Sequence, residues 1–113
     1  MLKAYIESNV AFMAAHRSHV VALVEIFTHA RRRAGRPVVD PHKHEAGLME
    51  LAQILRRGQR SGEFRSFSTQ VMAVSIRAAI DAITLRMLTE PRLELDAYGR
   101  ELAALFRQAT RAN

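Results

Sequence analysis

The apolar residues of this chain recur with helical spacing, and this period most constrains what the chain can fold into. They fall three or four positions apart, as in the run Val20, Leu23, Val24 and Phe27, which is typical of one face of an α-helix. No segment alternates apolar and polar residues long enough to predict a strand. The sequence therefore predicts an all-α fold.

Glycine and proline residues divide the chain into separate helices. The run Gly35-Arg36-Pro37 is expected to end one helix, and Asp40-Pro41 to begin the next. Gly62 and the pair Glu90-Pro91 end two further segments, and Ser68 is a suitable N-cap. The predicted helices span residues 2–15, 17–34, 41–61, 69–89 and 95–111, with residues 16–19 read either as a bend or as part of one long helix.

The length and composition predict one globular domain. The chain has 113 residues, of which 49% are hydrophobic and 25% charged, which is ordinary for a globular domain. It has no Cys, so disulfides, thiolate metal sites and cysteine nucleophiles are excluded. Neither an apolar run of membrane-spanning length nor a signal peptide is recognisable, and we expect a cytoplasmic location.

The segment 69–89 is apolar on two faces. Its first stripe contains Met72, Ile76, Ala79, Ile80, Ile83 and Met87, and its second contains Val71, Val74, Ala78, Ala82 and Leu85. On a helix these stripes lie roughly 140° apart. We expect one stripe to join the core of the chain and the other to meet a second subunit. The alternative is that this helix is central within a monomer.

Three motifs give the chain a resemblance to a known family. Residues 55–65 contain the turn Gly58-Gln59-Arg60-Ser61-Gly62-Glu63-Phe64-Arg65, which resembles a signature of the TetR (tetracycline-repressor) family of bacterial transcription regulators. The segment 78–83 is similar to that family's "A-x-x-D-G-hydrophobic" pattern, with Ala82 where Gly is commoner. Residues 95–106 resemble the family's closing helix. The resemblance covers nearly the whole chain.

This resemblance implies an effector-binding and homodimerisation domain. The expected fold is a five-helix bundle like the TetR C-terminal domain, in which the last two helices of each subunit form an intersubunit four-helix bundle. The family's N-terminal helix-turn-helix domain has no counterpart in residues 1–113. The chain is therefore interpreted as one ligand-binding and dimerisation domain, either an expression fragment or a naturally short protein. DNA would be contacted only through the missing domain.

The resemblance also implies a pocket between helices for a small, largely apolar effector, without a cofactor. The candidate ligand-binding residues are Phe12, His16, Leu23, Phe27, Met49, Met72 and Ile76. The candidate dimer-interface residues are the second stripe of segment 69–89 and four residues of the last helix: Val71, Val74, Ala78, Ala82, Leu85, Leu102, Ala103, Phe106 and Ala109. For each of these residues the alternative is packing within the chain.

Other classes of function find less support in the sequence. Residues 31–65 carry nine Lys and Arg against four Asp and Glu, which is +5 of the total charge of +6, but they lack interleaved aromatic residues and a recognisable groove reader. The histidines supply only pairs, His16 with His19 and His42 with His44, whereas a metal needs three or four converging ligands. No catalytic motif is present, and we expect no enzyme. The alternatives are a stand-alone helical interaction module and a basic nucleic-acid-binding bundle.

Overall fold

The protein is all-α, as the sequence predicts. A computed structural model describes residues 1–34 and 41–113, with side chains described for residues 1–26, 29–30 and 45–113. Within these residues the helices are α1 (Leu2–Ala15), α2 (Arg17–Ala34), α3 (Pro41–Arg60), α4 (Thr69–Thr89) and α5 (Leu95–Thr110). Their ends differ from the predicted ends by at most one residue.

Local signals explain most of these helix ends. Ser68 caps α4, since its hydroxyl accepts a hydrogen bond from the amide of Val71 at 3.2 Å. Between α1 and α2 the backbone leaves helical geometry at His16 (φ −121°, ψ 33°), so the chain bends there and does not form one long helix. The predicted signals at Gly35-Arg36-Pro37 and Asp40 lie outside the described residues.

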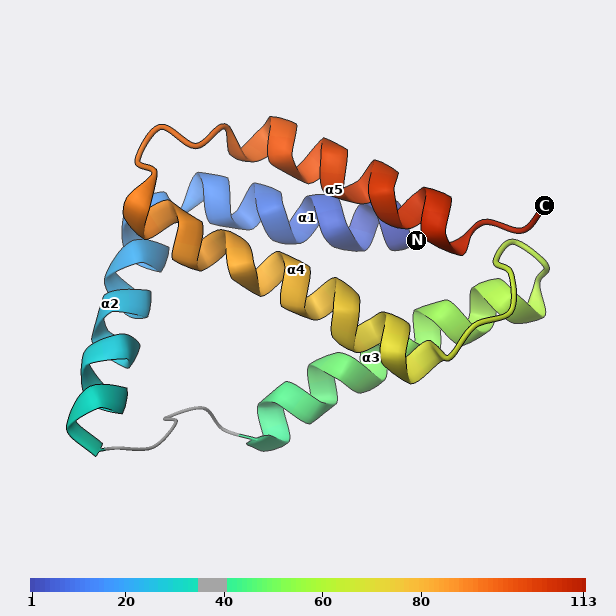
Figure 1. Ribbon diagram of the computed structural model, residues 1–113, viewed down its shortest axis with the longest axis horizontal. Coiled ribbons are helices and arrows are strands. Elements are labelled where there is room, and N and C mark those ends of the chain that lie inside the picture. Colours follow the sequence, from blue (N-terminus) through green and yellow to red (C-terminus); the bar gives the residue numbers. More distant parts are fainter. Residues whose placement is uncertain (35–40) are drawn as a thin grey trace.

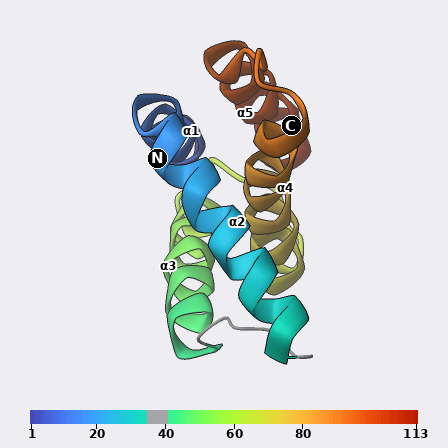
Figure 2. The ribbon, with the colours of Figure 1, turned by 90° about the vertical axis from the view of Figure 1, so that its left-hand side faces the viewer.

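Helices α1, α2 and α3 pack against α4, and α5 packs along α1. Helices α1 and α5 lie side by side and run in opposite directions, with α4 beneath them and α3 along the other side of α4 (Figure 1). Helix α2 turns away from α1 and packs against α4 near the C-terminal end of α4 (Figure 2). None of the helices in residues 1–34 and 41–113 has the length and apolar character needed to cross a bilayer.

Among the described side chains, one apolar core is formed by residues of α1, α3, α4 and α5, and Val20 and Val21 of α2 pack against it. Its fully buried side chains include Ile6 and Val10 of α1, Leu51 and Leu55 of α3, and Ile76, Ile80 and Ile83 of α4. Each such side chain contributes roughly 1.5–3 kcal/mol on leaving water. At Gly99 a Cβ atom would lie 3.0 Å from Cγ1 of Val10, so the glycine lets α5 approach α1 closely.

Two arginines tie the helices together through polar contacts. The Arg77 guanidinium donates to Asp81 at 2.7 Å and reaches across to α1, where it donates to the hydroxyl of Tyr5 at 3.1 Å and to Asn9 at 3.4 Å. Burial lowers the pKa of Arg77, but its bonds to Asp81 and Tyr5 outweigh this effect and leave the pKa raised. Arg17 donates to the carbonyls of Leu93 and Glu90 at 2.9 and 3.1 Å, which fixes the turn after α4.

The conspicuous turn of residues 58–65 closes tightly on itself. The Phe64 ring lies directly over Gly58, where a Cβ atom would be only 2.0 Å from Cδ2 of the ring. The Phe64 amide donates to the Gly58 carbonyl at 2.9 Å. Gly62 has a φ of +82°, in the left-handed region that favours glycine. Each glycine of the motif therefore has a steric or conformational reason.

The same turn fastens the end of α3 to the end of α5. The Arg65 amide donates to the Thr110 carbonyl at 2.8 Å, and the Arg65 Nε donates to the Ala109 carbonyl at 2.7 Å. The Ala112 amide returns a bond to the Glu63 carbonyl at 3.1 Å. The two contacts from Arg65 satisfy carbonyls that the last turn of α5 leaves without partners. We refer to residues 58–65 with their bonds to α5 as the clasp.

The first prediction concerns the clasp. In Gly58→Ala the new methyl group would collide with the Phe64 ring. The ring cannot easily move away, because the backbone of Phe64 and of the residues before and after it is held by hydrogen bonds. We expect this variant to lower the free energy of unfolding by about 1–3 kcal/mol, as overpacking does. Urea denaturation followed by circular dichroism measures the change.

Gly47→Ala is the matched control, because a Cβ atom at Gly47 would meet nothing within 4 Å. Gly47 lies inside α3, so this substitution should raise stability by about 0.5–1 kcal/mol. If both substitutions raised the free energy of unfolding equally, the position of the Phe64 ring would not require a glycine at residue 58.

Candidate ligand-binding groove

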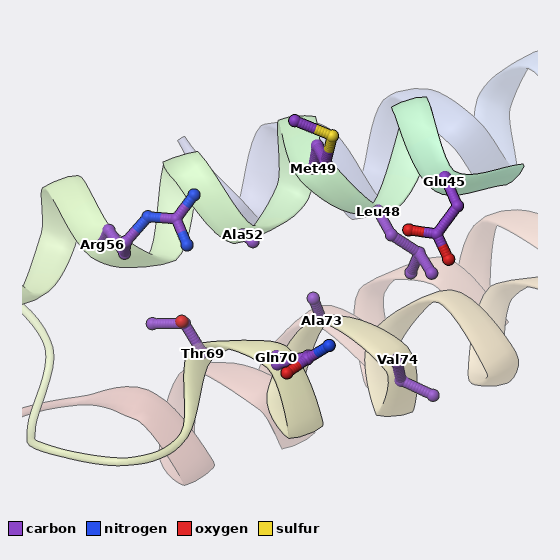
Figure 3. A pocket seen from close by; sticks show the side chains of 9 residues that line it. All are labelled: Glu45, Leu48, Met49, Ala52, Arg56, Thr69, Gln70, Ala73 and Val74. Atoms are coloured by element: carbon purple, nitrogen blue, oxygen red, sulfur yellow. The ribbon is translucent and has the colours of Figure 1, made fainter. Parts of the chain in front are cut away.

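A groove of about 420 Å³ runs between α3 and α4 (Figure 3). This volume falls in the range of small-molecule sites in proteins. Its walls come from about three turns of α3 and the first two turns of α4. The lining residues are Glu45, Leu48, Met49, Ala52, Arg56, Thr69, Gln70, Ala73 and Val74.

The groove exists because α3 is anchored by one face only. Leu51 and Leu55 are fully buried and hold α3 to the core, whereas Met49 is 59% exposed. Ala52 of α3 and Ala73 of α4 both line the space between the helices, and their small side chains leave it open. Close-packed helices with larger residues at these positions would fill it.

The groove is apolar in its middle and carries opposite charges at its two ends. Figure 3 shows Glu45 at one end of the α3 wall and Arg56 at the other, about 16 Å apart along the helix at 1.5 Å per residue. Thr69 of α4 lies on the wall opposite Arg56, and Gln70 lies beside Ala73 nearer the middle of the groove. The arrangement suits a small molecule with an apolar body and an anionic group near Arg56.

The structure brings one of the predicted ligand-binding residues to this groove, Met49. Ile76 is fully buried in the core, and Met72 is half-buried against it. The rings of Phe12 and His16 are exposed and stack on each other at 4.3 Å between centroids, and neither residue is among those lining the groove. Leu23 is exposed on α2, and the side chain of Phe27 lies outside the described residues.

The polar residues of the groove were missed from sequence because nothing local distinguishes them. Arg56 belongs to a pair with Arg57, and only Arg56 lines the groove. A period of 3.6 residues shows which side chains share a helix face, but it does not show which two faces meet. The small side chains of Ala52 and Ala73 are the one feature of the sequence that could have indicated space between α3 and α4.

The second stripe of α4 lies on the surface, opposite the stripe that fills the core. Val71 is 66% exposed and Leu85 is 59% exposed, and Val74, Ala78 and Ala82 are exposed as well. Helix α4 is thus apolar on both faces. We refer to these five residues as the outer stripe.

Helix α5 offers less exposed apolar surface for a dimer interface than the sequence suggests. Leu102 and Ala103 are 7% and 5% exposed and belong to the core, so they are not free to form a dimer interface. Phe106 and Ala109 are half-buried. The reason is that α5 packs along α1, which covers the α5 face that was predicted to meet a second subunit.

The structure does not bring the described histidines together into a site for a metal ion. Nδ1 of His16 lies 3.0 Å from the Phe12 carbonyl, and His19 is exposed. Among the described residues, no three His, Asp or Glu side chains come together in a way that could hold a metal ion. The side chains of His42 and His44 lie outside the described residues.

Comparison with known proteins does not identify a family. No family model, no curated protein and no solved structure matches this chain. A proposal for the function of this chain therefore draws its structural support from the groove and the outer stripe.

The second prediction tests the charged end of the groove with anilinonaphthalenesulfonate, a dye that has an apolar body and one anionic group. Arg56→Gln should weaken dye binding about threefold, the effect of one exposed ion pair. Ala52→Trp should weaken it at least tenfold, because an indole would occupy the apolar middle. Fluorescence titration measures both.

Arg57→Gln is the matched control, since Arg57 neighbours Arg56 on α3 but does not line the groove. It should leave dye binding unchanged. Equal binding by the Arg56 and Ala52 variants and the unsubstituted protein would place the dye elsewhere on the molecule.

Proposed function

We propose that this chain is the effector-binding and homodimerisation domain of a cytoplasmic TetR-like transcriptional repressor. In the complete protein, binding of a small, largely apolar effector would lead to release of the operator. The observation that carries this proposal is the outer stripe of α4, an apolar helix face left on the surface while the opposite face fills the core.

The spacing of the outer stripe suits a second copy of the same chain. The stripe is symmetric about Ala78: an antiparallel copy of α4 would pair Val71 with Leu85, Val74 with Ala82, and Ala78 with itself. A two-fold axis requires such self-complementarity. The exposed alanines in the middle would allow the two helices to approach closely.

Helix α4 also connects the groove to the rest of the molecule. Thr69 and Val74 line the groove, and Arg77 one turn later contacts α1 through Tyr5. An effector that changes the spacing between α3 and α4 would therefore displace the contact with α1. Such coupling requires the effector to have different affinities for the two arrangements.

The clasp contains the turn on which the resemblance to the TetR family is based. Gly58, Gly62, Phe64 and Arg65 are the residues of the turn that resembles the TetR signature, and each has a defined role in joining α3 to α5. We propose that the same turn joins the corresponding helices in the TetR family.

The third prediction concerns the dimer. Sedimentation should show a dimer for the unsubstituted chain and a monomer for Ala82→Arg, because a charged side chain within the outer stripe, opposite Val74 of the second copy, would be buried without a partner. Ala11→Arg is the control, since Ala11 is exposed on α1 and should leave the dimer intact. A monomer at high concentration for the unsubstituted chain would contradict the proposal and favour a stand-alone interaction module.

A cysteine variant locates the axis. The chain has no Cys, so Ala78→Cys introduces a single thiol at the proposed two-fold axis. A short bismaleimide should link two copies of this variant and should not link Ala11→Cys. Efficient linking of Ala11→Cys alone would place the interface on α1.

DNA binding provides the fourth prediction. The chain alone should bind duplex DNA at most weakly, without sequence preference and with strong dependence on salt, as basic proteins do. Fluorescence anisotropy with a labelled duplex at two salt concentrations measures this. Tight and sequence-specific binding by this chain would overturn its interpretation as a regulatory domain.

A further inference from the structure

A cationic hollow lies between the start of α1 and the end of α5, on a different part of the molecule from the groove and the outer stripe. Its volume is about 380 Å³. Lys3 and Glu7 line it from α1, and Arg100, Arg107 and Arg111 line it from the α5 side. Four cations face one carboxylate, which leaves a formal excess of +3.

The antiparallel packing of α1 and α5 creates this concentration of charge. Arg100 and Arg107 are seven positions apart, so they lie within roughly 20° of one line along α5, and Arg111 follows directly after the last turn of the helix. The close approach of the helices at Gly99 and Val10 brings α1 alongside this line. Lys3 is thereby added to the row of arginines from a remote part of the sequence.

The cations of the hollow are available to a ligand. Among the described residues, the side chains of Lys3, Arg100, Arg107 and Arg111 take part in none of the hydrogen bonds or ion pairs. Ala103 and Ala104 line the hollow between the arginines, and their small side chains leave the guanidinium groups accessible. A bound anion would thus gain new charge-assisted bonds without breaking existing ones.

A second hollow of about 400 Å³ adjoins the first and shares Lys3, Arg107 and Arg111 with it. Its other lining residues include Leu2 and Phe64, which are apolar, and Glu63, whose carboxylate is negatively charged and can accept hydrogen bonds. The three shared cations therefore stand between a charged compartment and a partly apolar one. This arrangement has the form expected for a charged tail attached to a flat organic group.

We propose that the hollow between α1 and α5 binds a small polyphosphate, with the phosphates held by Lys3, Arg107 and Arg111. Arginine forks match phosphate oxygens in pairs, and an excess of +3 suits a ligand with several negative charges. The volume suits a small molecule. The ligand is either an inorganic polyphosphate or a nucleoside triphosphate whose base would occupy the compartment beside Phe64.

Isothermal titration with ATP, tripolyphosphate and adenosine tests the proposal on the full chain. We expect saturable binding of one molecule per chain for ATP or for tripolyphosphate, and none for adenosine. Tighter binding of ATP than of tripolyphosphate identifies a nucleotide, and equal binding identifies the phosphate run alone. Binding of neither compound at millimolar concentration overturns the proposal.

Variants separate a specific site from general attraction to a basic protein. Arg107→Gln should weaken binding about tenfold, the effect of a hydrogen bond to a charged group, and Arg107→Lys should weaken it less. Arg92→Gln removes the same charge at the opposite end of α5, where Arg92 lines neither hollow, and should change binding less than twofold. Equal losses for Arg92→Gln and Arg107→Gln would overturn the proposal, as would tighter binding of duplex DNA that displaces ATP.

Discussion

The burial of one face of α4 is the constraint on which the rest of the structure depends. Ile76, Ile80 and Ile83 have no exposed surface, and α1, α2 and α3 all contact the helix that carries them. The other helices cover this face of α4 and leave its outer stripe on the surface. The central position of α4 therefore produces both the core and the surface for which we propose a second copy of the chain.

The clasp sets the position of α3 relative to the other helices. Phe64 packs over Gly58 at the end of α3, and Arg65 bonds to the last carbonyls of α5. Helix α3 is thus held at its end by the clasp and along its length by Leu51 and Leu55. The groove occupies the remaining space between α3 and α4, so its width depends on these two attachments.

Sequence reasoning located the helices well because their ends depend on neighbouring residues. Ser68 caps α4 through an amide three residues away, and Glu90-Pro91 follows directly after its last turn. The two faces of α4 could also be read from the period, and the outer stripe is exposed as that reading requires. Of the candidate ligand-binding residues, Ile76 lies in the core and Met49 lines the groove, whose lining also includes Arg56 and Gln70, which the sequence did not mark.

The sequence by itself determined the helical content, the helix ends and the two apolar faces of α4, since all of these follow from interactions within about four residues along the chain. Only the tertiary structure decided that α5 packs on α1, which buries Leu102 and Ala103, and that Lys3 joins Arg107 at one hollow. Helical period assigns a residue to a face of its own helix. Which faces meet is decided by the packing of the whole chain, in which apolar faces of different helices are buried against one another.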